Sequence, residues 1–410
     1  MKVVINAVSA KLGGGATYIS NLLRHVSLLA RDSQFLVFLP PETIETLHSL
    51  PDNIRLMPTR VGYGRWWKRM WWEQVTLRRV LRNEKPDILF SAANFGMLQC
   101  PVLQILLIQN ALYFSSAFQE LFFPKCSLRR RAGFLLRRWL VCESVRGADL
   151  VIIPTQAALD DLRRFVQVPP AKALVNPYGG KIPEAGTDPA RGGHGAHRLG
   201  ESGPVDLLYV SLYFEHKNLT TLLKAMPVLN SQGSPKFKLT TTLDPASEVH
   251  ASWTITGPTD LALAGRSDIR DSLEVVGLLG PAETQELYGQ ADIFVFPSLA
   301  ESFGFPMVEA MAHGLPIVAA DTPVNREICE EAAVYFSPLN FDDLAAKIRR
   351  VTTDDVLRSR LSAAGPPRVA TCFRWSEHVG RILGSFRRIL AESRAGAPKP
   401  SSGTQAGRRL

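Results

Sequence analysis

The sequence predicts an α/β protein built from two doubly wound parallel domains. Short apolar, β-rich runs alternate with amphipathic helical runs in both halves of the chain, which is the pattern of parallel sheets covered by helices. At 410 residues the chain is long for one domain and comfortable for two. Residues 181–204 are rich in glycine, proline and alanine, and such a composition predicts a linker.

These patterns predict domains over residues 1–180 and 205–375, a last helix over 376–392 and a tail over 393–410. The tail lacks periodicity and aromatic side chains, which predicts disorder. A hinge in the linker suits a two-domain enzyme that closes over its ligand.

Composition limits the partners and the compartment. A net charge of +9 and a pI of about 9.4 favour anionic partners such as nucleotide phosphates or a lipid surface, and no nucleic-acid-binding motif is visible. Five scattered cysteines without a CxxC pair predict reduced thiols in the cytoplasm. The first residues, MKVVINAV, predict a strand and no signal peptide. No apolar run approaches the ~18 residues that span a bilayer, so we expect any contact with the inner face of the membrane to be peripheral.

In the first half, a glycine run follows the strand KVVINAV. Gly14 and Gly15 precede a helix that we expect to open at Ala16 or Thr17, and such a turn places bare backbone beside a ligand or is only a tight connection. The runs KPDILFSAANFG and PVLQILLIQNALYF predict two more strands, followed by Asn94 and Asn110. Ligands of open α/β sheets bind at these strand ends, and the amides can bond an acceptor there.

Two basic amphipathic helices are predicted over residues 65–82 and 127–149. In the first, Trp67, Trp71 and Val75 share a face and are surrounded by arginine and lysine. This pattern predicts either tryptophans packed in the N-terminal core or a helix lying in the headgroup layer of an anionic membrane. The arginines of the second helix suit a phospholipid or a pyrophosphate-linked acceptor, or a solvated face.

In the second half, Lys217 stands just before a helix that begins near Asn218. A cation beside helix-start amides makes a pocket for a diphosphate. The stretch FVFPSLAESFGFPMVEAMAHGLPIVAA then predicts strand, loop, helix and strand, with the helix opening at Pro306. The amides of Gly304 and Phe305 offer a second anion site. Glu301 and Glu309 can accept hydrogen bonds from sugar hydroxyls, or they are two solvated glutamates on a helix turn.

The run E-S-F-G-F-P-x-x-E-A-M-A-x-G-x-P resembles the signature of the family 4 glycosyltransferases, which are retaining enzymes with the GT-B fold. The resemblance implies two Rossmann-like domains facing each other across a cleft, with the last helix crossing back to the first domain. It implies that Glu301 faces the donor sugar and Glu309 binds the donor ribose, that Lys217 with Gly304, Phe305 and Ser302 serves the donor phosphates, that Leu278 lies in the loop at the nucleotide base, and that Gly14 and Gly15 approach the reacting centre.

The chain departs from the family pattern at two positions. Gln109 stands where many relatives have a histidine near the donor sugar, and Leu212 stands where they have a phosphate-binding arginine. The resemblance implies metal-independent transfer of a hexose, without a cofactor, from a nucleotide-diphosphate sugar to a glycan or lipid-linked acceptor in surface polysaccharide synthesis. The alternative is a degenerate relative that binds a sugar nucleotide or a partner without turnover.

Overall fold

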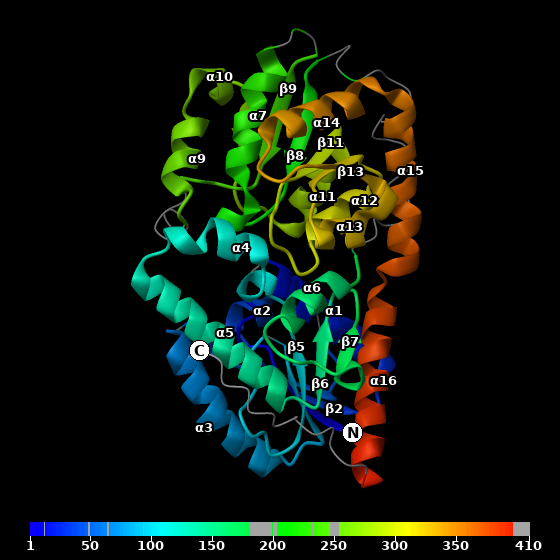
Figure 1. Ribbon diagram of the computed structural model, residues 1–410. Helices are drawn as coiled ribbons and strands as arrows, with labels where there is room; N and C mark the ends of the chain where they lie inside the picture. Colours follow the sequence, from blue (N-terminus) through cyan, green and yellow to red (C-terminus); the bar gives the residue numbers. More distant parts are fainter. Residues whose placement is uncertain are drawn as a thin grey trace. The chain divides into compact units, whose positions relative to one another are not determined.

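The computed structural model describes residues 1–396 apart from 12, 48–49, 64, 93, 181–198, 200–202, 232, 234 and 247–253. The chain divides into two compact units, each described here by itself (Figure 1). Unit 1 comprises Met1–Phe114, Ala132–Tyr178 and the C-terminal segment from Trp375; unit 2 comprises Ser115–Arg131 and Gly179–Arg374. The predicted linker and tail lie largely outside the described residues, and the predicted domain boundaries stay predictions.

Unit 1 contains a parallel sheet of seven strands in the order β3-β2-β1-β4-β5-β6-β7. Its strands are short, mostly apolar runs, and the central strands β1, β4, β5 and β6 are buried over at least four residues each, as expected for a parallel sheet covered on both faces. Their bounds are β1 Lys2–Asn6, β2 Gln34–Leu39, β3 Ile54–Pro58, β4 Ile88–Ser91, β5 Leu103–Leu107, β6 Leu150–Ile153 and β7 Ala173–Val175. The helices are α1 Gly14–Leu29, α2 Pro41–Glu45, α3 Trp66–Glu84, α5 Leu128–Gly147, α6 Gln156–Arg163 and α16 Trp375–Arg394, with α5 starting in unit 2.

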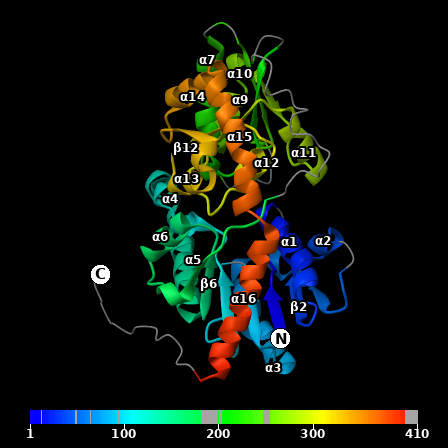
Figure 2. The same ribbon diagram turned by 90° about the vertical axis from the view of Figure 1, so that its right-hand side faces the viewer.

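The last helix, α16, packs on α1 within unit 1 (Figure 2). His378 is buried at this contact, where its Nδ1 donates to the Pro177 carbonyl at 2.9 Å and its Nε2 accepts from the Tyr18 hydroxyl at 3.2 Å. The rings of Tyr18 and Trp375 lie 5.8 Å apart. Helix α16 extends one residue earlier and two residues later than the predicted range 376–392.

Unit 2 contains a parallel sheet of six strands in the order β10-β9-β8-β11-β12-β13. The strands are β8 Val205–Tyr209, β9 Phe237–Thr241, β10 Leu273–Val275, β11 Ile293–Phe296, β12 Ile317–Ala320 and β13 Ala333–Phe336. The helices are α4 Ser116–Leu121, α7 Leu219–Ser231, α9 Gly257–Ala264, α10 Ser267–Arg270, α11 Pro281–Gln290, α12 Phe305–Ala312, α13 Pro323–Cys329, α14 Phe341–Thr353 and α15 Asp355–Cys372. Both units are therefore doubly wound α/β domains, which confirms the predicted fold class.

Several local expectations need correction. Helix α1 begins at Gly14, two residues before the earliest expected position, because Gly13 takes the cap position with φ of 59°. Helix α12 begins at Phe305, so Pro306 is its second residue. The core interpretation of Trp67 and Trp71 is wrong, since both side chains are exposed, and the tryptophan that packs inward is Trp72 against Phe38, with ring centroids 5.3 Å apart.

None of the helices in the described part of the chain is both long enough and apolar enough to span a membrane.

Candidate active site

The topology of unit 2 marks where a ligand should bind. The strand order reverses between β8 and β11, which are parallel neighbours whose connections leave toward opposite sides of the sheet. Open α/β sheets bind ligands outside the carboxyl ends of the strands at such a switch point. The loop after β8 carries Lys217, predicted to bind the donor phosphates, and the loop after β11 carries Glu301, predicted to face the donor sugar, so the two residues that we expect to be catalytic lie at this position.

Lys217 and Glu301 form a direct ion pair. The Nζ atom of Lys217 lies 2.5 Å from Oε1 of Glu301, and the two side chains expose only 13 % and 12 % of their surface. Ser298, the last residue before the loop turns, donates from its hydroxyl to the same oxygen at 2.6 Å. Glu301 is therefore oriented by a cation and a hydroxyl, and Lys217 is held where its charge is only weakly screened by water.

The turn that carries Lys217 is held by hydrogen bonds to both flanking strands. Asn218 adopts a left-handed conformation with φ of 57°, and its Nδ2 donates to the Pro297 carbonyl at 3.1 Å. The Tyr209 hydroxyl donates to the Lys217 carbonyl at 2.8 Å, and the amide of Leu299 donates to the His216 carbonyl at 2.9 Å. These hydrogen bonds join the β8 and β11 loops to each other.

His216 contributes no positive charge to this turn. Burial and the neighbouring Lys217 charge lower the pKa of His216 well below its usual value of 6.5, and its ring stacks on Phe214 at 5.7 Å. The imidazole is therefore neutral at pH 7. His216 therefore does not replace the charge of the arginine that the family pattern has at Leu212, and Lys217 supplies a positive charge from this turn.

The start of α12 forms the second part of the site. Gly304 caps the helix with φ of 86°, a conformation that glycine adopts without steric cost. A side chain there would also place its Cβ 2.5 Å from Cε of Met307. The first amides of α12 and the positive end of its dipole follow directly from the loop with Glu301 and Ser302.

Glu309 lies on α12, where the sequence did not indicate its partners. The buried Tyr288 of α11 donates its hydroxyl to Oε2 of Glu309 at 3.0 Å. The ring of Tyr288 stacks on His313 with centroids 5.3 Å apart, and Nδ1 of His313 lies 2.9 Å from the Glu309 carbonyl. One carboxylate oxygen of Glu309 is thus fixed by Tyr288. From the sequence, the one hint of this contact is a tyrosine in the helix before β11, and the sequence does not indicate which residue that tyrosine contacts.

Leu278 lies in the loop between β10 and α11, beyond the outer strand of the unit 2 sheet, and exposes 69 % of its side chain. Gly277 before it has a positive φ of 69°. Leu212, which replaces the family arginine, is half-buried after β8. A contact of Leu278 with a nucleotide base stays a prediction.

The remaining predicted residues belong to unit 1, again at carboxyl ends of strands. Gly14 is exposed and Gly15 half-buried at the start of α1 after β1. Asn94 is buried, and its Oδ1 accepts from the amides of Gln109 at 2.7 Å and Asn110 at 3.1 Å. Asn110 is exposed and caps a short helical turn by accepting from the Leu112 amide. The side-chain oxygens of both asparagines therefore stabilise the loop. That these residues also contact the acceptor substrate stays a prediction.

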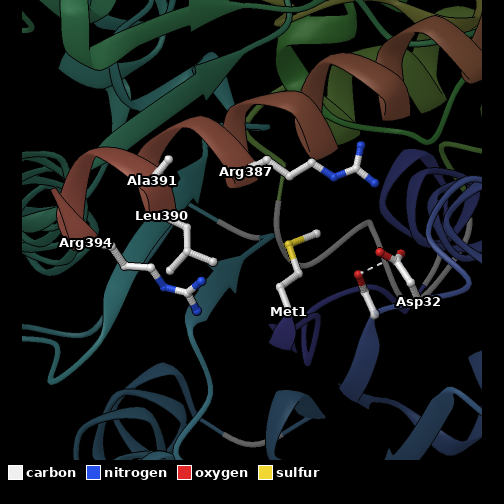
Figure 3. Close-up of a pocket in the computed structure, with 7 residues that line it drawn as sticks. Met1, Asp32, Arg387, Leu390, Ala391 and Arg394 are labelled. Carbon is white, nitrogen blue, oxygen red and sulfur yellow. Dashed lines mark hydrogen bonds between the residues drawn. The ribbon is translucent and has the colours of Figure 1, made fainter.

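A cavity of about 330 Å³ lies elsewhere in unit 1, lined by Met1, Asp32, Arg387, Leu390 and Arg394 among others (Figure 3). Met1 and Asp32 precede β1 and β2, so the cavity opens at the amino ends of the strands. Ligands of open sheets bind at the opposite edge, and we do not assign the active site to this cavity. Within the described residues, no three His, Cys, Asp or Glu side chains are grouped as a metal site.

Two doubly wound parallel domains, one of which carries a lysine, a helix start and two carboxylates after its strands, define the class: a two-domain α/β protein with a candidate anion site. Comparison with known families agrees: residues 12–179 match the model described as Glycosyltransferase Family 4, and residues 198–368 match Glycosyl transferases group 1. The chain belongs to the family 4 glycosyltransferases, and its two Rossmann-like domains are those of the GT-B fold.

Individual relatives are more distant. An MMP alpha-(1->4)-mannosyltransferase of Mycolicibacterium hassiacum is 28 % identical over 178 residues, covering 43 % of this chain and 41 % of its own. An O-antigen chain mannosyltransferase B of Escherichia coli is 25 % identical over 180 residues, 44 % of this chain and 45 % of its own. The aligned parts thus span less than half of either relative. The structure of Anabaena HepE in complex with UDP and glucose superposes with a TM-score of 0.67 and 17 % identity, covering 94 % of this chain and 99 % of that one.

Proposed function

We propose that the protein transfers a hexose from a nucleotide-diphosphate sugar to a glycan or lipid-linked acceptor, with retention of configuration, in the assembly of a bacterial surface polysaccharide. The observation that carries this proposal is the Lys217–Glu301 pair at the switch point of unit 2. In this proposal Lys217 serves as the cation for the leaving diphosphate, and Glu301 serves as the carboxylate for the sugar. The names of the relatives, two mannosyltransferases, and of a neighbour bound to UDP and glucose support the same class of substrate.

The proposed reaction exchanges one glycosidic bond for another. The bond between the anomeric carbon and the diphosphate oxygen breaks, and the acceptor hydroxyl forms its bond on the same face of the sugar. The leaving phosphate oxygen takes the proton of that hydroxyl, so no basic side chain is required. Lys217 and the amides of Gly304 and Phe305 neutralise the charge that develops on the diphosphate, which is usually the largest catalytic contribution.

The other residues position the donor. Glu301, oriented by Ser298 and Lys217, accepts hydrogen bonds from the sugar. Glu309, fixed through one oxygen by Tyr288, presents the carboxylate for the ribose hydroxyls. In this proposal the reaction needs neither a cofactor nor a metal ion, and activity should persist in EDTA.

The first experiment measures donor binding and hydrolysis. Wild-type protein, Glu309→Ala and the control Glu331→Ala, whose side chain is exposed on a different element, are heated with UDP-, GDP-, dTDP- and ADP-sugars. We expect one nucleotide to raise the melting temperature of wild type and Glu331→Ala but not of Glu309→Ala. Slow release of the sugar, with its anomeric configuration retained by NMR, supports the transfer mechanism. Inversion, or unchanged donor binding by Glu309→Ala, contradicts it.

A second candidate function is binding of a sugar nucleotide without turnover. Leu212 removes one of the two phosphate-binding cations of the family, and Gln109 removes a histidine. The two functions differ in a single readout. A donor that stabilises the chain but is neither hydrolysed nor transferred, with any acceptor offered, would favour the binding protein.

A further inference from the structure

Three neighbouring tryptophans of α3 lie on the surface of unit 1. Trp66, Trp67 and Trp71 expose 39 %, 48 % and 59 % of their side chains. Single exposed apolar residues are ordinary on a protein surface, but a group of large ones marks an interaction site. Since Trp72 already fills the place against the sheet, the other three have no core of this unit to enter.

We call the three exposed side chains of α3, Trp66, Trp67 and Trp71, the tryptophan face.

The charge around the tryptophan face is positive. Between Trp66 and Asn83 the sequence contains a single acid, Glu73, and this side chain is buried and paired with Arg69 at 2.8 Å. From residue 65 to residue 83, the exposed charged side chains are all cations: Arg65, Lys68, Arg79 and Arg82. The Nζ atom of Lys68 lies 5.6 Å from the Trp67 ring centroid. An acid turned inward and cations turned outward give the face one sign.

We propose that the tryptophan face docks unit 1 onto an anionic phospholipid bilayer. Indole rings favour the boundary between headgroups and acyl chains, where the ring is in apolar surroundings and its N–H finds a polar partner. Lysine and arginine beside them are attracted by anionic headgroups. A second copy of the chain fits less well, because a two-fold interface would set one row of cations against its equivalent. The proposal does not depend on the proposed transfer reaction.

Binding of the full chain to vesicles tests the proposal. The vesicles contain phosphatidylcholine with or without about one-third phosphatidylglycerol, and the bound fraction is measured by sedimentation. We expect binding to the anionic vesicles only. Trp67→Ser/Trp71→Ser should lower the partition coefficient at least tenfold, because two large apolar groups no longer leave water. Arg79→Gln/Arg82→Gln should lower it about fivefold for each cation removed.

The matched control is Val356→Ser/Arg360→Gln, which changes an exposed apolar and an exposed basic residue on α15 of unit 2. It should bind like wild type. Lipids brominated near the headgroup should quench the fluorescence of wild type more than that of Trp67→Ser/Trp71→Ser. Equal binding to neutral vesicles, or unchanged binding by the tryptophan variant, overturns the proposal. The proposal is also overturned if sedimentation velocity shows a wild-type dimer that only the tryptophan variant loses. Binding to single-stranded RNA as tight as binding to anionic vesicles would overturn it as well.

Discussion

Replacing either member of the Lys217–Glu301 pair should destabilise unit 2 far more than replacing both. At 2.5 Å, two unit charges attract by about 7 kcal/mol at an effective dielectric constant of ~20. Moving two ions out of water costs several kcal/mol for each ion, which offsets most of that attraction. Because both side chains are nearly nine-tenths buried, one that loses its partner keeps the desolvation cost without the attraction.

We therefore expect Lys217→Met and Glu301→Gln each to cost about 3 kcal/mol of unfolding free energy, and the double variant about 1 kcal/mol. For a domain of this size 3 kcal/mol corresponds to a fall in melting temperature of roughly 6–12 °C. Calorimetry of the four proteins gives the coupling energy as a double-mutant cycle. Lys217→Arg, which keeps the charge, is the control and should lose least. Costs that are small and simply additive would show that the pair is solvated, and the argument from burial would be wrong.

Three further predictions concern single side chains. Tyr288→Phe removes the hydroxyl that fixes Glu309, so we expect the KM for the donor to rise about fivefold with kcat little changed. A fall in kcat at unchanged KM, measured by steady-state kinetics, would contradict this. Burial lowers the pKa of His378 to about 3 from 6.5, so between these pH values the unfolded chain binds a proton that the folded chain does not. About 4–5 kcal/mol of stability that is present above pH 6.5 is therefore lost as the pH falls toward 3. His378→Gln should flatten the profile of melting temperature against pH, and an equally steep profile would exclude His378 as the source of the pH dependence. Gly304→Ala should cost about 1–2 kcal/mol through the positive φ and displace Met307, and a variant as stable as wild type in urea unfolding would argue against strain at this cap.

Much of the fold could be predicted from the sequence because parallel strands have a simple signature. Runs such as Ile88–Ser91 and Ile293–Phe296 are buried on both faces, so they are continuously apolar and end at turn residues. The loops at their carboxyl ends could then be marked as candidate sites. Helix starts were less predictable, since the glycines before α1 indicate a loop while the helix already begins at Gly14.

The contacts inside the site could not be predicted, because they join residues distant in the sequence. Lys217 and Glu301 are 84 positions apart, and only the pairing of β8 with β11 brings their loops together. In α3 the helical period could not show which tryptophans face the core, since aromatic residues occur on more than one side. The position of α3 on the sheet determines which tryptophan is buried: Trp72 packs against Phe38 of β2, and Trp71 is exposed.

The charge balance of the donor pocket follows from these contacts and makes Lys217 unusually important in the proposed reaction. Leu212 supplies no charge, His216 is neutral at pH 7, and the Arg130 guanidinium that reaches this turn is paired with the buried Glu215. Of the residues in the turn after β8, Lys217 therefore carries the positive charge that can meet a diphosphate. Its ion pair with Glu301 must then be exchanged for, or shared with, the phosphate oxygens when the donor binds. The same lysine would thereby both hold the sugar-facing carboxylate in place and release part of that hold as the leaving group becomes charged. Since Arg130 is already paired with Glu215, Lys217→Met should abolish donor binding even though Glu309 and the amides of α12 remain.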